Sequence, residues 1–280
     1  MPESQPERQA HWGIPRETLK RTQEATFSVD LPNTQKHGMP TPRGTGFFVS
    51  PDGWFVTAAH VVTENGQSSG KPRNDFAQCC LMKELRLENP VPPMCQHLEL
   101  KLVAPKNDFA LVKVDLAKNV EKAFLKGKKG FPFIEVSKRR LDEGEPVFSF
   151  GYPLPSAEVA QVSWGHIGTV EHCPRVASAI VSSTFERSKM VMSANDTQVY
   201  VLDKALNYGN SGGPIVATST GRTHAFCSRF QPLVVPQPHI LMEGKPIQIL
   251  MPSLYGIVVS LANPDILQIF DKLGIKYGDE

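Results

Sequence analysis

The sequence contains no run of apolar residues long enough to cross a bilayer, and its first residues lack the apolar core of a secretory signal. A membrane-spanning helix needs a stretch of about 18 or more apolar residues. We therefore expect no membrane partner. The polar start mixes acidic and basic residues, which predicts an N-terminal tail over residues 1–25 rather than a targeting segment.

The chain also lacks an excess of charge of either sign. It has 30 basic and 28 acidic residues, a net charge of +2. So balanced a composition does not indicate a nucleic-acid partner. The segment 118–140 is dense in Lys and Arg, and it is interpreted as a solvated face, with a docking patch for an acidic protein as the alternative.

Cysteine is scarce and irregularly spaced. An odd number of cysteines does not form the framework of a small secreted domain, so we expect free thiols, a reducing compartment and a cytoplasmic location. A zinc site built from some of these thiols and His97 is the alternative, but the paired CxxC spacing of structural zinc is missing. We expect no metal and no organic cofactor. The five cysteines are Cys79, Cys80, Cys95, Cys173 and Cys227.

Short segments rich in Val, Ile, Phe and Thr recur along the chain and alternate with turn residues. About a dozen such segments, in two groups, predict an all-β protein made of two barrels. The proline-rich stretch GYPLPSAEVA separates the groups, which places one barrel in residues 26–155 and the other in 156–280.

Two helices are predicted. The C-terminal segment NPDILQIFDKLGI has Asn263 as N-cap, Pro264 in the first position and Gly274 as the stop. The shorter one is expected in TAAHVVTE, where a strand ends.

The stretch YGNSGGPIV surrounds Ser211 with glycines. A serine hydroxyl needs an adjacent base to act as a nucleophile at neutral pH. Glycines allow a close backbone approach, so the amides of Gly209 and Ser211 could face a developing oxyanion. Taken alone, the stretch indicates only a glycine-rich turn.

Two further segments supply a base and an acid. His60 follows an apolar strand and two alanines in WFVTAAH, and Asp108 opens the strand in NDFALVKV. A buried carboxylate can fix a histidine tautomer. Asp75, in RNDFAQ, is the alternative acid, although a polar, cysteine-rich stretch follows it.

Together, TAAH, DFAL and GNSGGP resemble the motifs of trypsin-like (chymotrypsin-fold) serine proteases. The stretches GTGFFVSPDGWFVTAAHVV and DKALNYGNSGGPIV are similar to the HtrA/Deg branch. The resemblance implies two six-stranded antiparallel β-barrels with a C-terminal helix. It also implies that His60 is the general base, Asp108 its orienting acid and Ser211 the nucleophile, with an oxyanion hole at Gly209, Asn210 and Ser211.

The sequence departs from these families at three places. Val61 stands where secreted trypsins have a cysteine, and Asn210 stands where they have the aspartate that pairs with a new N-terminus. We expect an enzyme that is competent as made or controlled by a regulatory protein partner. HtrA proteins usually carry a PDZ domain after the protease domain, and we expect none here because the second barrel uses the residues after Ser211.

The resemblance also locates a primary substrate pocket. Ala205 lies six residues before Ser211, where proteases that cleave after Arg or Lys have an aspartate. We therefore expect apolar P1 residues. The predicted lining comprises Ala205, Leu206, Val258, Val259 and Ser260.

The sequence therefore predicts a serine endopeptidase that acts on polypeptide substrates. The alternative is a catalytically silent, protease-like binding or scaffold module, because a fold does not determine function. The sequence does not indicate an oligomeric state or a physiological substrate.

Overall fold

The computed structural model describes most of the chain. The described residues are 13–31, 41–64, 70–83, 85–86, 98–117, 125, 128–153, 156–162, 165–172, 174–186, 198–204, 206, 208–230, 233–242, 245–251 and 255–279. Among them, no helix is long and apolar enough to cross a membrane.

Six strands form the first sheet. They lie in the order β4-β1-β2-β3-β7-β6, and neighbouring strands are antiparallel. Their bounds are β1 Thr26–Leu31, β2 Thr41–Phe48, β3 Trp54–Ala58, β4 Cys80–Met82, β6 Glu99–Ala104 and β7 Phe109–Lys113.

The second sheet closes on itself. The order β14-β9-β12-β13-β18-β15 returns to β14 through a β14–β15 pairing, which makes a six-stranded barrel. Strand β8 pairs in parallel with β15, and β19 pairs in parallel with β8. The bounds are β8 Val136–Ser137, β9 Pro146–Gly151, β12 Arg175–Glu186, β13 Gln198–Leu202, β14 Pro214–Ala217, β15 Thr223–Phe230, β18 Gly256–Ser260 and β19 Tyr277–Gly278.

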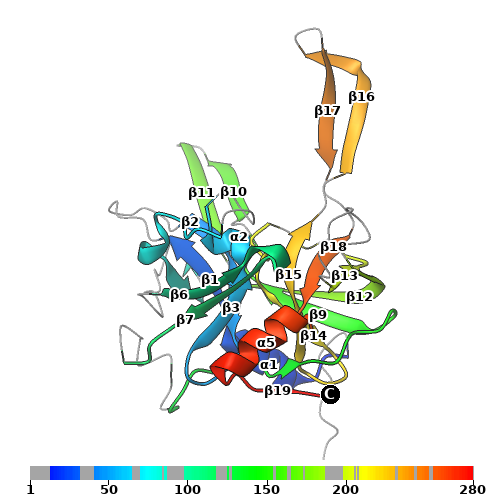
Figure 1. Cartoon of the computed structure of the whole chain (residues 1–280). Coiled ribbons are helices and arrows are strands. Elements are labelled where there is room, and N and C mark those ends of the chain that lie inside the picture. Colours follow the sequence, from blue (N-terminus) through cyan, green and yellow to red (C-terminus); the bar gives the residue numbers. More distant parts are fainter. Residues whose placement is uncertain are drawn as a thin grey trace, which may run out of the picture.

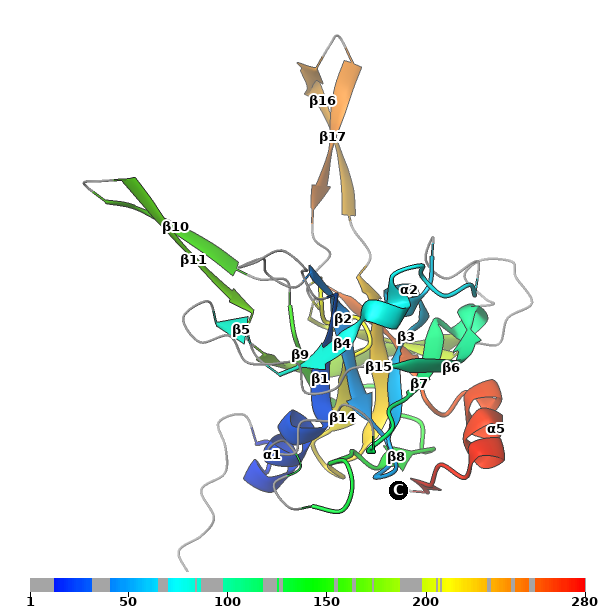
Figure 2. The same ribbon diagram turned by 90° about the vertical axis from the view of Figure 1, so that its left-hand side faces the viewer.

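Two hairpins extend beyond the barrels. One joins β10 (Ser156–Val162) to β11 (Gly165–His172), which also pairs with β5 (Leu85–Arg86). The other joins β16 (Leu233–Met242) to β17 (Lys245–Met251). Both project from the same end of the molecule (Figures 1 and 2).

The predicted all-β fold with a C-terminal helix is confirmed. Helix α5 (Pro264–Leu273) begins after Asn263 and ends at Gly274, whose φ is +69°. Helix α2 (Ala59–Val62) forms where β3 ends. MVMSA (residues 190–194), one of the short apolar segments expected to form strands of the second barrel, lies outside the described residues. Two short 3₁₀ helices, η2 (Phe76–Gln78) and η3 (Pro105–Asn107), precede β4 and β7.

Residues 16–25 correct the expected N-terminal tail, because they form helix α1 (Arg16–Ala25). Its buried face consists of Thr18, Thr22 and Ala25. Arg21 donates a hydrogen bond of 2.8 Å to the carbonyl of Gly221 in the second barrel. The fully buried face of the helix thus consists of small and polar side chains, while Leu19 packs half-buried against the hydrophobic core.

The change from one sheet to the other comes earlier than the boundary at residue 155. Strands β8 and β9 end at Ser137 and Gly151, and both pair within the second sheet. The proline-rich stretch used to place the boundary therefore follows the first strands of the second barrel.

One buried hydrophobic cluster contains residues of both barrels and of the C-terminal helix. Phe109 of β7 lies 6.0 Å, centroid to centroid, from Phe226 of β15 and from Phe270 of α5. All three rings are fully buried. This packing holds β7, which follows Asp108, against β15, which carries Ser228.

A buried acid in the first barrel makes stability depend on pH. Burial raises the pKa of Asp30 in β1 to about 7, although a hydrogen bond from Ser28 works to lower it. Between about pH 4 and 7 the folded chain therefore keeps a proton that the unfolded chain releases. The free energy of unfolding falls as the pH rises through this range, by up to about 1.4 kcal/mol per pH unit.

Asp30→Asn is expected to remove this pH dependence, because the amide has no proton to lose. Urea unfolding between pH 5 and 8 measures it, with the exposed Asp142→Asn as the matched control. If the free energy of unfolding of Asp30→Asn still falls with pH as in the unmodified protein, Asp30 ionises in the folded protein as it does in water.

Candidate active site

The structure brings His60 and Asp108 into contact within the first barrel. His60 lies in α2, directly after β3, and its side chain is 28% exposed. Its Nδ1 is 2.9 Å from Oδ2 and 3.0 Å from Oδ1 of Asp108. This contact leaves Nε2 as the ring nitrogen that can take a proton from a nucleophile.

Asp108 is completely buried and lies in a tightly held turn. Its backbone is left-handed, with φ of 52°, at the end of η3. The carboxylate accepts three donors: the backbone N–H and the Nδ1 of His60, and the hydroxyl of Ser228 at 2.5 Å. These donors fix the position of the carboxylate and, through it, the orientation of the imidazole.

Ser228 was missed by sequence reasoning. It lies in β15 and is buried, and nothing in AFCSRF distinguishes it from an ordinary strand residue. Only the packing of β15 against the first barrel brings its hydroxyl to Asp108. Its carbonyl is also the acceptor for the Oγ of Ser211, at 3.5 Å.

Ser211 lies between the two barrels. Its carbonyl accepts a hydrogen bond of 2.8 Å from the backbone N–H of Thr45 in β2. A Cβ added at Gly44 would lie 2.9 Å from the same carbonyl and 2.6 Å from Val61. The serine therefore lies beside the turn that carries His60. Within the described part of the chain its Oγ contacts Ser228 and not His60, and such catalytic hydrogen bonds often form only with substrate bound.

The loop before Ser211 leaves amides free to bind an anion. Thr45 fixes the position of this loop, because its hydroxyl donates a hydrogen bond of 2.6 Å to the carbonyl of Gly209. Within the described residues, the N–H groups of Gly209 and Ser211 have no acceptor. Asn210 between them is buried and packs against Gly151. Gly209 and Ser211 are half-buried, so their N–H groups can donate to the oxygen of a bound ligand.

The glycine after the serine fits a space that no other residue can fill. Gly212 has φ of +87°, and a Cβ there would collide with the backbone carbonyl of Thr45. Its N–H donates to the carbonyl of Cys227 at 2.6 Å. The tight approach of the loop to β2 and β15 depends on this residue.

Gly212→Ala is therefore expected to destabilise the protein by several kcal/mol, because backbone collision adds to strain of about 1–2 kcal/mol. Gly144→Ala is the matched control: its φ is +84°, but a Cβ there would meet nothing within 4 Å. Urea unfolding of both variants measures the difference. Equal losses would mean that the loop can move away from β2.

A buried thiol lies close to the paired histidine and acid. Burial, and then the charge of Asp108, raises the pKa of Cys227. Cys227 is therefore a neutral thiol and has no nucleophilic character. Cys79 and Cys80 are also free and buried.

The predicted substrate pocket needs correction at β18. Val258, Val259 and Ser260 are completely buried, and their side chains present no surface to a substrate. The strand is covered on both faces, so alternate residues fill two separate core clusters. At its start, a Cβ added at Gly256 would lie 3.1 Å from the Cγ of Leu206. Leu206 is buried, and Ala205 lies outside the described residues.

The alternative acid has other partners. Asp75 is 2.7 Å from Arg43 and 3.1 Å from Arg73. Partial burial works to raise its pKa, but the hydrogen bond and charge of Arg73 and the charge of Arg43 outweigh it, and the pKa is lowered. Asp75 therefore stays ionised beside these arginines, while His60 Nδ1 contacts Asp108.

The other predicted features have ordinary roles or lie outside the described residues. No group of three or more His, Cys, Asp or Glu in the described residues could hold a metal ion, while Cys95 and His97 lie outside them. In the basic segment, Lys128 pairs with Glu24 and Arg139 with Glu145.

A family model described as a trypsin-like peptidase domain matches residues 44–225. The match includes His60, Asp108 and Ser211. Among solved structures, the HtrA-type protease AlgW with a tripeptide aligns with a TM-score of 0.53 at 17% identity, over 92% of this chain and 64% of that one. This likeness shows the fold.

Curated relatives share part of the sequence. Serine protease HTRA1A of Danio rerio is 28% identical over 183 residues, which are 65% of this chain and 29% of that protein. Serine protease HTRA4 of Homo sapiens is 27% identical over 204 residues, 71% of this chain and 33% of that protein. The chain thus spans about a third of the length of these relatives.

Proposed function

The chain belongs to the trypsin-like peptidase domain family, and on that basis we propose that it is a serine endopeptidase that forms an acyl-enzyme on Ser211. One observation carries the proposal: a buried Asp108 with three hydrogen-bond donors holds His60 beside a serine whose loop has two amides without an acceptor among the described residues. In the proposed reaction, His60 Nε2 takes the proton of Ser211 Oγ as Oγ attacks the scissile carbonyl carbon.

The free amides and the imidazolium then complete acylation. The carbonyl oxygen becomes an oxyanion, and the N–H groups of Gly209 and Ser211 donate to it. When the C–N bond breaks, His60 gives its proton to the departing amine. Asp108 stabilises the imidazolium and keeps Nδ1 protonated throughout. Water then attacks the acyl-enzyme with the same base and frees Ser211.

We propose that apolar side chains precede the bond that is cleaved. The described lining of the pocket, Leu206 and Gly256, carries no charge, and Leu206 occupies the space next to the glycine. A buried site without a carboxylate cannot stabilise a substrate cation. Small or medium aliphatic residues fit this environment.

A peptide library read by mass spectrometry tests the proposal, with Ser211→Ala protein as the control. We expect the unmodified protein to cleave peptides after apolar residues and the Ser211→Ala protein to cleave none of them. Dominant cleavage after Arg or Lys would overturn the pocket assignment. No cleavage of any peptide would favour the alternative, a silent binding or scaffold module.

We propose a reducing, cytoplasmic working environment. Val61 offers no partner for a disulfide beside His60, and the thiols of Cys79, Cys80 and Cys227 are free and buried. Disulfides are rare in compartments that keep thiols reduced. Thiol counting on protein from its natural source, without reductant, tests this proposal, and the finding of a disulfide would contradict it.

A further inference from the structure

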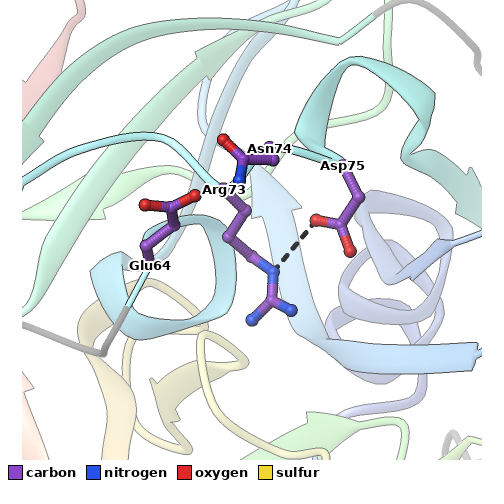
Figure 3. A pocket seen from close by; sticks show the side chains of 4 residues that line it. All are labelled: Glu64, Arg73, Asn74 and Asp75. Atoms are coloured by element: carbon purple, nitrogen blue, oxygen red, sulfur yellow. Dashed lines mark hydrogen bonds and ion pairs between the residues drawn. The ribbon is translucent and has the colours of Figure 1, made fainter.

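The described residues of the first barrel line a pocket of about 460 Å³. Glu64, Arg73, Asn74 and Asp75 line it, and Figure 3 shows Arg73 between Glu64 and Asp75. Its volume falls within the range of small-ligand sites. No step of the proposed chemistry uses these residues.

The pocket is joined to the active site by short backbone links. The N–H of Arg73 donates to the carbonyl of Val62, two residues after His60, at 3.0 Å. Arg43 adjoins Gly44, which lies against the carbonyl of Ser211. Since consecutive Cα atoms are about 3.8 Å apart, the backbone of each arginine lies only a few residue lengths from His60 or Ser211.

The links to Val62 and Gly44 place the pocket on the first-barrel side of Ser211. The apolar P1 site, at Leu206 and Gly256, belongs to the second barrel, whereas Arg43 and Arg73 belong to the first. A substrate that places P1 in the second barrel and its carbonyl at Ser211 must continue past Gly44. Residues after the scissile bond, at about 3.3 Å each, therefore run along the first barrel beside the pocket.

The charges around the pocket favour an anion. Two arginines share the single carboxylate of Asp75, and Lys71 pairs with Glu64 at 3.2 Å. These five side chains leave a net charge of +1. Arg73 uses Nε for Asp75, and neither of its terminal nitrogens has a hydrogen-bond partner among the described residues. A guanidinium with two free terminal nitrogens matches a carboxylate in bidentate geometry.

We propose that this pocket binds a substrate carboxylate after the scissile bond, from an acidic side chain or from the chain end, through Arg73. The inference rests on the proposed protease function. It assigns Arg73 a role in substrate specificity, while cleavage itself depends on His60, Asp108 and Ser211.

The test measures binding rather than cleavage, so that its outcome does not depend on catalysis. Fluorescence polarisation compares labelled peptides bound to Ser211→Ala protein. The peptides carry valine at P1, an amidated C-terminus and either Glu or Gln at P1′, P2′ or P3′. A further set of peptides carries Gln and ends in a free carboxylate at P1′, P2′ or P3′. This set tests whether the chain end supplies the carboxylate.

We expect a carboxylate at one of these positions to tighten binding about tenfold, which is about 1.4 kcal/mol, because a charge-assisted hydrogen bond is stronger than a neutral one. Adding Arg73→Gln should abolish the preference, and Arg73→Lys should keep part of it. Arg222→Gln, at an exposed ion pair with Glu135 in the second barrel, should keep all of it. Thermal melts check that each variant is folded.

Equal binding of all peptides, no measurable binding, or a preference that survives Arg73→Gln would overturn the proposal. Loss of the protease function itself has a different signature, which is the absence of cleavage and of covalent labelling at Ser211 in the unmodified protein.

Discussion

Ser211→Ala and His60→Ala are each expected to lower kcat/KM on the best library peptide by about 10⁶-fold. The hydroxyl forms the covalent bond, and the imidazole is the only base beside it in the described site, so neither works without the other. Because they act as one unit, the double variant should lose little more than either single variant. Steady-state kinetics on purified protein measures this.

The matched control is Ser219→Ala, which removes an exposed hydroxyl in the turn between β14 and β15. Its kcat/KM should stay within about twofold of the unmodified protein, since surface substitutions have small effects. Activity of Ser211→Ala within tenfold of the unmodified protein would mean that another group is the nucleophile.

Asp108→Asn is expected to lower kcat by about 10⁴-fold. The carboxylate accepts hydrogen bonds from three donors, two from His60 and one from Ser228. An asparagine has one oxygen acceptor and brings two N–H donors of its own, so it cannot satisfy all three. The imidazole would then hold its proton on the nitrogen that should face Ser211.

The matched control is Asp52→Asn, which removes an exposed carboxylate paired with Lys113 in the same barrel. This change should leave kcat almost unaltered. A thermal melt of Asp108→Asn separates loss of catalysis from loss of fold. A folded Asp108→Asn variant with more than a tenth of normal kcat would contradict the assigned role.

The residues with proposed chemistry were predictable because their motifs are local. His60 directly follows β3, Asp108 directly precedes β7, and the Ser211 loop precedes β14. Each is anchored by an apolar strand whose alternation and turn residues can be recognised in the sequence. The two barrels and helix α5 follow from the same signals.

What could not be predicted depends on contacts between distant segments. The role of Ser228 arises only when β15 packs against the first barrel. Helix α1 buries Thr18, Thr22 and Ala25, which carry almost no apolar signal. The substrate pocket was misplaced onto Val258 and Val259 because a strand that is buried on both faces gives no alternation to show which face is which.

Covalent labelling tests the central claim most directly. Purified protein is treated with a fluorophosphonate probe, and the adduct is located by peptide mass spectrometry. We expect a single adduct on Ser211 that is lost in both Ser211→Ala and His60→Ala. An unlabelled Ser211, or labelling that persists in His60→Ala, would show that His60 does not activate this serine.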